Sequence, residues 1–280
     1  MDDRTGLRLD WLSQSESLTE ALKIQEDRIR RQARDTDLRL MHLDLLCLLG
    51  QWERALTQLD VLIRLDQSQE AEATVYRLLI RAELDRRRLF ARPEHPPLAV
   101  APSSPWFADL WAAFQAQAAG LTDEADEARH RALALISARP GRALLKAEGA
   151  GVDFDWIIDS DSRLGPLTEL IIDGQYAWLP FDEIDKIGFR PIRHPRDLIW
   201  PQVDLDRPAG PLHTFLLARY PGSEELEDVL RLGRETRWRD EGQTATIGFG
   251  QRVWASSGRD LAVYDLAGLD FAGAAHGPIQ

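Results

Sequence analysis

The sequence is poor in several features that would assign a function at once. Its 280 residues include a single cysteine, Cys47, so no internal disulfide can form and a reducing compartment is expected. Because Cys47 lies inside a helical apolar stretch, we interpret it as a buried, inert thiol. No apolar run approaches the roughly eighteen residues of a membrane-spanning helix, and the polar, acidic N-terminus is unlike a signal peptide. We therefore predict a cytoplasmic protein with no membrane insertion.

Basic charge is also in the minority. The chain carries 34 Lys and Arg against 46 Asp and Glu, which gives a net charge of −12 and a sequence pI of about 5.0. A protein with this net negative charge is disfavoured as a partner of nucleic acid or of an anionic membrane. Residues 151–280 carry 22 acidic and 13 basic side chains. The acidic excess is therefore mostly C-terminal.

The N-terminal half has the apolar spacing of paired helices around Gly50, which stands where a left-handed residue would end the first helix. The Leu-Gly-x-aromatic-x-x-Ala junction there is similar to that of the tetratricopeptide repeat (TPR), in which the aromatic residue, here Trp52, wedges between helices. On both sides of the glycine, apolar residues recur at steps of three and four, as on one face of an amphipathic helix: Leu38, Met41, Leu45 and Leu48, then Trp52, Ala55, Leu56, Leu59, Leu62 and Ile63.

The repeat is degenerate along the chain. Leu18 and Ala21 precede Trp52 and Ala55 by 34 residues, which is one repeat length, whereas Arg86–Arg88 interrupts the next copy. Because a repeat array needs about three units to bury a continuous core, we expect the second half of the chain to cover the open end. Further helices are predicted at about 18–34, 71–90, 105–119 and 122–136, with a proline-rich crossover at 93–105.

After Gly151 the pattern changes to short alternating runs separated by turn residues. Strands are predicted at 152–156, 175–179, 187–189, 199–203, 212–217, 244–249, 252–255 and 261–266. Short helices are predicted at 167–172 and 223–232, and 142–150 has the composition of a linker. The expected fold is α+β with two domains. Residues 1–141 would form a degenerate TPR-like helical domain, and residues 142–280 a mainly antiparallel sheet with one or two helices.

Four carboxylates lie close together in the second half, at Asp153, Asp155, Asp159 and Asp161. Carboxylates are oxygen ligands for divalent cations, so a metal-dependent enzyme using the Asp153–Asp161 carboxylates stays as an alternative. The EF-hand spacing, with its central glycine and distal glutamate, is missing. A solvated strand face followed by an Asx turn explains the same residues.

No catalytic constellation is recognisable elsewhere in the sequence. Gly248-Phe-Gly250 follows a predicted strand but lacks the third glycine of a dinucleotide turn. Ser223 is not in a G-x-S-x-G context, and His194 and His213 belong to no metal-binding pair. The sequence therefore predicts a protein that is not an enzyme and that uses no cofactor or metal.

Four segments look like the ImpE/TagJ accessory proteins of type VI secretion. They span nearly the whole chain in the family's order: Leu46–Leu56 with its Leu-Gly-Gln-Trp junction, Trp156–Pro166 with Asp-Ser-Arg-Leu-Gly-Pro, Ala218–Ser223 with Arg-Tyr-Pro-Gly-Ser, and Gly250–Arg252. The resemblance implies a two-domain cytoplasmic adaptor without known catalytic activity. It also implies two partners, the small subunit of the contractile sheath, bound through its N-terminal helix, and the ClpV-type AAA+ ATPase that disassembles the sheath.

The two most specific motifs supply the candidate motif or partner-contact residues. These are Asp159, Asp161, Ser162, Arg163, Gly165, Pro166, Arg219, Tyr220, Pro221, Gly222 and Ser223. Whether they shape loops or contact a partner stays open. For Arg163 and Arg219 we expect hydrogen bonds to backbone carbonyls or to a carboxylate such as Asp159 or Asp161, because the planar guanidinium offers five donors in a fixed fork.

Overall fold

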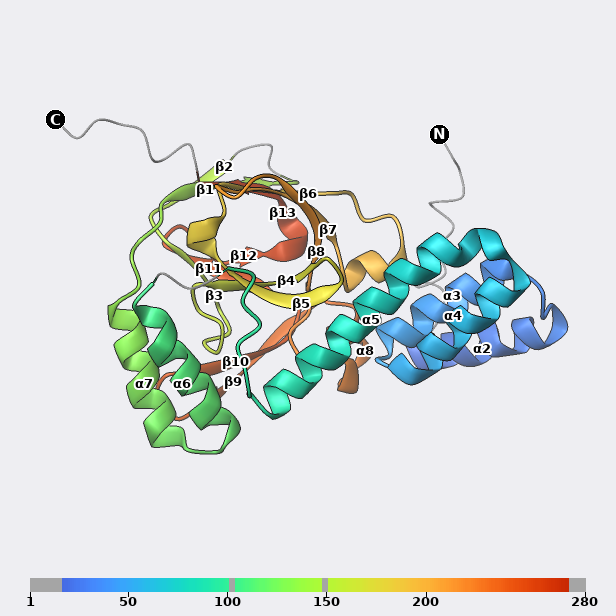
Figure 1. Cartoon of the computed structure of the whole chain (residues 1–280), viewed down its shortest axis with the longest axis horizontal. Coiled ribbons are helices and arrows are strands. Elements are labelled where there is room, and N and C mark those ends of the chain that lie inside the picture. The colour runs from blue at the N-terminus through green and yellow to red at the C-terminus, as the bar shows by residue number, and fades with distance from the viewer. Residues whose placement is uncertain (1–16, 101–103, 148–150, 272–280) are drawn as a thin grey trace.

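A computed structural model of the chain describes residues 17–100, 104–147 and 151–271. It has a helical lobe at one end, a strongly curved sheet, and a separate helix pair beside the sheet, with one long helix running between the two helical parts (Figure 1). The helices are α2 (Leu18–Arg31), α3 (Thr36–Leu48), α4 (Trp52–Leu65), α5 (Glu70–Ala91), α6 (Trp106–Ala118), α7 (Thr122–Ala134) and the short α8 (Asp228–Arg231).

The helical lobe is built around the predicted hairpin of α3 and α4. Gly50 has a φ of 65°, the left-handed conformation expected at the end of α3. Trp52 opens α4 and is 1% exposed, which confirms that its side chain belongs to the core. Cys47 is buried, also as predicted. Burial of α3 is wider than the predicted stripe, because every residue from Leu43 to Leu49 is buried; α3 is therefore a central helix and not a surface helix.

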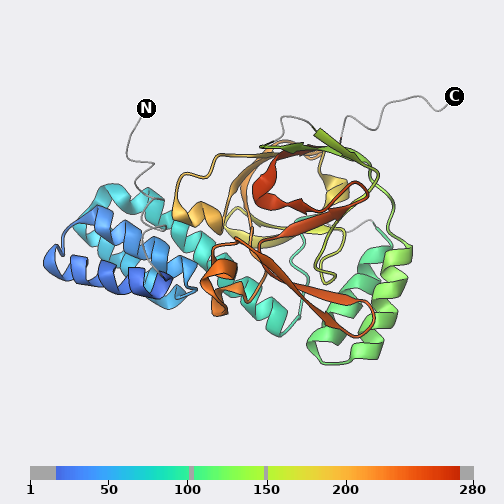
Figure 2. The ribbon, with the colours of Figure 1, turned by 180° about the vertical axis from the view of Figure 1, so that it is seen from behind.

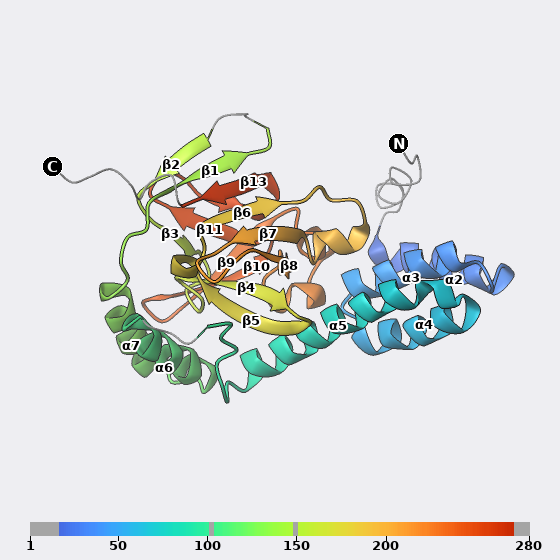
Figure 3. The same cartoon turned by 45° about the horizontal axis from the view of Figure 1, so that its top comes forward.

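The second half is a mainly antiparallel sheet, as predicted. Its largest sheet has the order β2-β1-β13-β6-β7-β8-β4-β5, and a β10-β9 hairpin and a β12-β11-β3 sheet complete it (Figure 3). The strands are β1 (Gly141–Leu145), β2 (Gly151–Phe154), β3 (Ile157–Asp159), β4 (Leu167–Ile172), β5 (Gln175–Pro180), β6 (Lys186–Phe189), β7 (Gln202–Asp206), β8 (Leu212–Leu216), β9 (Thr236–Glu241), β10 (Ala245–Gly250), β11 (Val253–Ser256), β12 (Leu261–Ala262) and β13 (Leu266–Asp270).

One hydrophobic core crosses from the helical lobe into the sheet half. Trp52 packs against Trp200, with ring centroids 6.0 Å apart. Trp200, Leu217 and Leu232 belong to the same buried cluster as the helices of the lobe. The open end of the degenerate repeat is therefore covered by the second half of the chain, as the sequence predicts.

The α6–α7 pair packs beside the β9–β10 hairpin (Figure 2). Asp126 of α7 accepts hydrogen bonds from the backbone N–H groups of Gln243 (2.6 Å) and Thr244 (2.9 Å) at the hairpin turn. Arg129 of α7 donates to the Thr244 hydroxyl at 2.9 Å. These polar contacts with the hairpin add to the apolar packing of α6 against β5, and together they hold this helix pair against the sheet half. Among the residues that the structure describes, no helix is long and apolar enough to cross a membrane.

Several local predictions are wrong. The strand predicted at 199–203 begins only at Gln202, and the strand predicted at 261–266 is interrupted by a 3-10 turn at Val263–Asp265. The segment Leu167–Ile172 is β4 and not a helix, because it is hydrogen-bonded between β5 and β8 and buried on both faces, which removes the alternation typical of a strand. The predicted helix over 223–232 is split into a 3-10 turn, Ser223–Glu225, and α8, because Leu226 between them is extended. The predicted linker contains β1. The charged and largely exposed β9 was not predicted at all.

Candidate functional site

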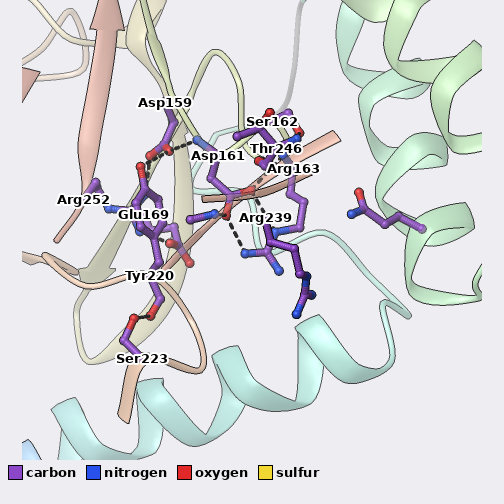
Figure 4. A network of polar contacts seen from close by, with 12 residues as sticks. Asp159, Asp161, Ser162, Arg163, Glu169, Tyr220, Ser223, Arg239, Thr246 and Arg252 are labelled. Carbon is purple, nitrogen blue, oxygen red and sulfur yellow. Dashed lines mark hydrogen bonds and ion pairs between the residues drawn. The ribbon is translucent and has the colours of Figure 1, made fainter. Parts of the chain in front are cut away.

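The two specific motifs form neighbouring loops on one side of the sheet (Figure 4). Asp159 is the last residue of β3, which pairs with β11, and the chain turns through residues 160–166 into β4. Arg219 and Tyr220 follow β8 and approach the residue pair Gly250–Gln251 at the end of β10. The order of strands in the sheets therefore brings together two segments whose hydrogen-bonded residues Asp159 and Tyr220 are 61 positions apart in the sequence.

Asp159 and Asp161 are both buried and both fully engaged. One oxygen of Asp159 accepts from the backbone N–H of Asp161 at 2.9 Å, and the other forms an ion pair with Arg252. Asp161 accepts from Arg163 Nε at 2.8 Å and Nη2 at 2.5 Å, a two-point contact with one guanidinium. It also accepts from the backbone N–H of Gly248 at 3.1 Å. The carboxylates therefore hydrogen-bond the loop to itself and, through Gly248, to β10.

Arg163 makes the predicted fork contact with a carboxylate, since Asp161 was one of the two expected acceptors. Its guanidinium also lies 4.8 Å from the centroid of the Phe90 ring of α5, a cation–π contact. The neighbouring Ser162 exchanges hydrogen bonds with the backbone of Thr246, donating from its hydroxyl at 3.2 Å and accepting at 2.9 Å. This part of the first motif is fixed by α5 on one side and by β10 on the other.

Gly165 and Pro166 shape the return into β4. Gly165 has a φ of 53°, which favours glycine, and its carbonyl accepts from the backbone N–H of Asp159 at 2.6 Å. The Pro166 carbonyl accepts from the backbone N–H of Phe181 at 3.0 Å. Both residues are buried, so their contacts lie inside the molecule.

Arg219 reaches from the sheet half into the helical lobe. Its Nη1 donates to the carbonyl of Leu48, at the end of α3, at 3.0 Å and to the carbonyl of Arg231 at 2.6 Å. The predicted hydrogen bonds of Arg219 to backbone carbonyls are therefore confirmed. The carbonyls in the last turn of a helix have no partner inside the helix, so Arg219 satisfies one of the free carbonyls next to the Gly50 junction.

Two further side chains of the second motif are internal. Tyr220 and Ser223 are fully buried. The Tyr220 hydroxyl lies 3.1 Å from Asp159 Oδ1 and 2.9 Å from the Val253 carbonyl, so it joins the second motif to the first. The Ser223 hydroxyl donates to the Tyr220 carbonyl at 2.6 Å and accepts from the Gly250 N–H at 2.8 Å. Pro221 is half-buried, and Gly222 has a φ of 85° and precedes the 3-10 turn.

Sequence reasoning assigned no role to the charged residues that connect the two motifs at their centre, although Arg252 ends the family segment Gly250–Arg252. Glu169 of β4 is fully buried and accepts from Arg86 of α5 at 2.7 and 2.6 Å. Arg252 forms ion pairs with both Glu169 and Asp159 (Figure 4). The signal for Arg86 was present in the sequence, because it continues the helical spacing of the buried Tyr76, Leu79, Ile80 and Glu83. Nothing comparable marks Glu169.

Burial raises and the neighbouring arginine charges lower the pKa of each of the two carboxylates that share Arg252. For Glu169, burial favours the neutral acid, but the charges of Arg86 and Arg252 outweigh it and lower the pKa to about 2. For Asp159, burial outweighs Arg252 and raises the pKa to about 7, with the nearby charge of Asp161 acting in the same direction as burial. Glu169 is therefore the fixed anion of the network, and Asp159 is the member that takes up a proton near neutral pH.

The geometry does not assemble the four carboxylates of the metal alternative. Asp153 is exposed on the strand β2 and pairs with Arg142 at 2.8 Å, whereas the oxygens of Asp159 and Asp161 are taken by arginines and backbone N–H groups. No group of three or more His, Cys, Asp or Glu side chains within residues 17–100, 104–147 and 151–271 is placed to hold a metal ion. The Ser223 hydroxyl is already hydrogen-bonded to the backbone of Tyr220 and of Gly250.

The fold and the motif loops define a two-part α+β protein whose signature polar residues join a helical hairpin to an antiparallel sheet. A model of the family described as ImpE protein matches residues 151–270. The chain is 35% identical over 256 residues to the type VI secretion system accessory component TagJ of Pseudomonas aeruginosa, and the match covers 91% of this chain and 87% of that protein. The chain therefore belongs to the ImpE/TagJ family of type VI secretion accessory components.

A solved structure has the same fold. The crystal structure of protein VPA1032 from Vibrio parahaemolyticus superimposes with a TM-score of 0.80 and covers 90% of this chain and 93% of that one. Its sequence identity is 24%, so the likeness concerns the fold alone. The arrangement of helical lobe, sheet and helix pair is thus found in a second protein.

Proposed function

We propose that this chain is a non-catalytic cytoplasmic adaptor of type VI secretion, which links the N-terminal helix of the sheath small subunit to the ClpV-type ATPase. The observation that best supports a non-catalytic role is the internal use of the motif side chains. Asp159, Asp161, Tyr220 and Ser223 are buried, and each has its polar atoms paired with other groups of the chain. A catalytic group needs an atom that is free to meet a substrate.

We further propose that the motif loops hold the two halves of the adaptor in a fixed arrangement. Arg219 donates to α3, and Arg86 of α5 donates to Glu169 and to the carbonyl of Arg219. These contacts cross the proposed boundary between a domain of residues 1–141 and a domain of residues 142–280. An adaptor needs its two binding surfaces in a fixed arrangement. If the joint between them were flexible, ordering it on binding would reduce the free energy of binding.

The helical lobe is the proposed site for the sheath helix. Helical-hairpin arrays bind helices or extended peptides through apolar anchors. Three large apolar side chains of this lobe are more than a third exposed, namely Ile24, Leu65 and Val75. A helix with apolar residues at i, i+3, i+4 and i+7 is the expected ligand.

The test is a titration of the full-length chain with a synthetic peptide of the N-terminal helix of the small sheath subunit from the same secretion system. We expect a dissociation constant of about 1 μM, near −8 kcal/mol, as for transient helix-in-groove contacts. A scrambled peptide of the same composition is the control. Absence of binding at about 1 mM peptide would refute the proposed partner.

The non-catalytic role has a separate check through metal ions. An adaptor of this kind should keep the same melting temperature in millimolar Mg²⁺, millimolar Mn²⁺ or chelator, because ligand binding to the native state raises stability by mass action. A rise of several degrees with one metal, lost on chelation, would instead favour the alternative based on the Asp153–Asp161 carboxylates.

A further inference from the structure

A small pocket lies where the second motif loop faces α5. Its volume is about 190 Å³, and one wall contains Pro221 and Gly222, the two residues of this motif that keep part of their surface exposed. The opposite wall is one face of α5, because its lining residues stand at positions i, i+3, i+4 and i+7 of the helix: Glu83, Arg86, Arg87 and Phe90. The pocket is therefore the place where the second motif meets solvent.

The positive charges around this pocket are already paired inside the protein. Each of the three arginines that line it forms an ion pair with a carboxylate of its own: Arg86 with Glu169, Arg87 with Glu225, and Arg163 with Asp161. An anion that entered the pocket would have to compete with these carboxylates, and two of the three, Glu169 and Asp161, are buried. Breaking a buried ion pair is costly, so the pairing disfavours an anionic ligand.

Glu224 differs from the other charged residues of the lining. It is half-buried, and within residues 17–100, 104–147 and 151–271 its carboxylate has no ion pair and accepts no hydrogen bond. The second carboxylate of the α5 wall, Glu83, is buried. Burial and the nearby charge of Glu224 raise the pKa of Glu83, against the opposing charge of Arg86. Two carboxylates that repel each other in one pocket favour a cation that contacts both.

Both walls of the pocket are held in place by contacts inside the chain. On the loop side, the carbonyl of Glu224 accepts from Arg231 Nε at 2.9 Å, and the Glu224 side chain packs against Gly50 at the α3–α4 junction. On the helix side, Arg86 is fixed by Glu169, and Glu83 accepts from Trp200 Nε1 at 3.1 Å. The pocket is thus formed before any ligand arrives, which reduces the entropy lost on binding.

We infer that this pocket receives a single arginine side chain of a protein partner. The guanidinium group would lie between Glu224 and Glu83, because its planar fork of five donors can serve two carboxylates at once. Its aliphatic stem would lie along Phe90 and Pro221, as the stems of long basic side chains lie on apolar surface. A volume of about 190 Å³ suits one side chain, since pockets for small-molecule ligands are roughly 300–1,000 Å³.

This contact goes beyond the adaptor role and is separate from the surface proposed for the sheath helix. None of Ile24, Leu65 and Val75 lines the pocket. The motif arginines keep their structural role, because Arg163 and Arg219 remain bonded inside the chain. Under this inference the second motif shapes one wall of the pocket, and Glu224, which directly follows the motif, supplies the charge.

The test is an NMR titration of the full-length protein with acetyl-arginine amide, read from the backbone amide signals of Gly222 and Glu224. The neutral probe of nearly the same shape is acetyl-citrulline amide. We expect a dissociation constant of about 1–10 mM for the arginine probe, a weak affinity that fits one side chain without the rest of the partner. The citrulline probe should bind about tenfold more weakly or not at all, because it lacks the positive charge.

Two variants locate the binding charge. Glu224→Gln keeps the size of the side chain and removes its charge, and we expect it to weaken binding of the arginine probe about tenfold. Glu227→Gln removes a charge from the same segment, but that carboxylate is exposed, does not line the pocket and already pairs with Arg237 at 2.9 Å. This control should change the affinity by less than about twofold. Melting curves check that both variants are folded.

Three results would overturn the inference. Equal weakening in both variants would mean that the probe senses only the net negative charge of the protein. Unchanged signals of Gly222 and Glu224 up to about 50 mM arginine probe would mean that the pocket does not bind it. Binding of acetate or phosphate at these signals, in place of the arginine probe, would mean that the lining arginines bind an anion. None of these results bears on the adaptor role, which the titration with the sheath peptide tests separately.

Discussion

The helical lobe and the motif loops are buried to a similar degree but are held by different forces. In the lobe, most of the side chains buried with Trp52 are apolar and contribute by their removal from water, although Gln25, His42 and Asp44 are buried there too. In the loops, the most deeply buried residues include Asp159, Glu169 and Arg252, which are costly to bury unless every charge is paired. We therefore expect the lobe to tolerate small changes in packing, and the loops to lose stability when any one partner of a buried charge is removed.

The two regions therefore need different numbers of other elements of the chain in order to form. A helical hairpin satisfies its own backbone and needs only a surface to cover its apolar face. The ion network draws on α5, β3, β4, the link between β10 and β11 that carries Arg252, and the segment before α8. We therefore expect substitutions in the lobe to act through lost packing, and substitutions in the loops to act through uncompensated charge.

The largest expected effect is at the junction of the two regions. Trp52→Ala should lower the free energy of unfolding by about 3–5 kcal/mol, because it leaves a cavity against Trp200 inside the shared core. Chemical denaturation of the full-length chain measures this directly. The exposed Trp156 is the matched control, and Trp156→Ala should cost less than about 0.5 kcal/mol. A Trp52→Ala variant that melts within a degree or two of the wild type would contradict the core position.

Removing the central cation of the network should have the next largest effect. Arg252→Met leaves the carboxylates of Asp159 and Glu169 with one partner fewer. We expect a loss of about 3 kcal/mol, at the lower end for a broken buried ion pair, because Asp159 is easily protonated and relieves part of the charge. In the control Arg142→Met, an exposed pair with Asp153 is lost, at a cost of about 0–1 kcal/mol. Equal losses in both variants would show that burial of the network is unimportant.

A glycine pair isolates the contact between the two halves. Gly50 and Gly120 both follow a helix with a positive φ, of 65° and 75°, so alanine strains the backbone by about 1 kcal/mol at either position. At Gly50 the added Cβ would also lie 2.6 Å from Cγ of Glu224 in the sheet half, whereas nothing lies within 4 Å at Gly120. Gly50→Ala should therefore be the more destabilising variant in denaturant titrations. Equal losses of stability in the two variants would mean that the Glu224 side chain moves away from the added Cβ at little cost.

Sequence periodicity predicted the apolar region well because each helix repeats apolar residues at steps of three and four. Trp52 and Gly50 could be assigned from their neighbours alone. The motif loops were recognisable as special, and the hydrogen bonds of Arg163 and Arg219 could be expected from the chemistry of the guanidinium group. Glu169 could not be found, because its partners Arg86 and Arg252 lie 83 residues away on either side. Long-range pairing of single charges leaves no local pattern, and a strand such as β4, buried on both faces, resembles a short helix.

Proton uptake by Asp159 predicts a small dependence of stability on pH. Its pKa in the folded protein, about 7, lies above its usual value, so the folded state holds the proton more tightly and stability falls as pH rises through 7. The wild type should lose about 2–4 °C in melting temperature between pH 6 and pH 8 relative to Asp159→Asn, which has no such proton. Parallel melting curves of the two proteins across this range would contradict the assignment to Asp159.

The claim that the motif arginines hold the structure rather than contact a partner is tested most directly with Arg163→Lys and Arg219→Lys. Lysine keeps the charge but loses the fork that binds Asp161 and the carbonyls of Leu48 and Arg231. Each variant is measured twice, by its melting curve and by its affinity for the sheath-subunit helix, with Arg142→Lys as the surface control. We predict a lower melting temperature for both variants, with affinity falling only in step with the folded fraction. Abolished binding with an unchanged melting curve would contradict the claim and make the motif loops the binding surface.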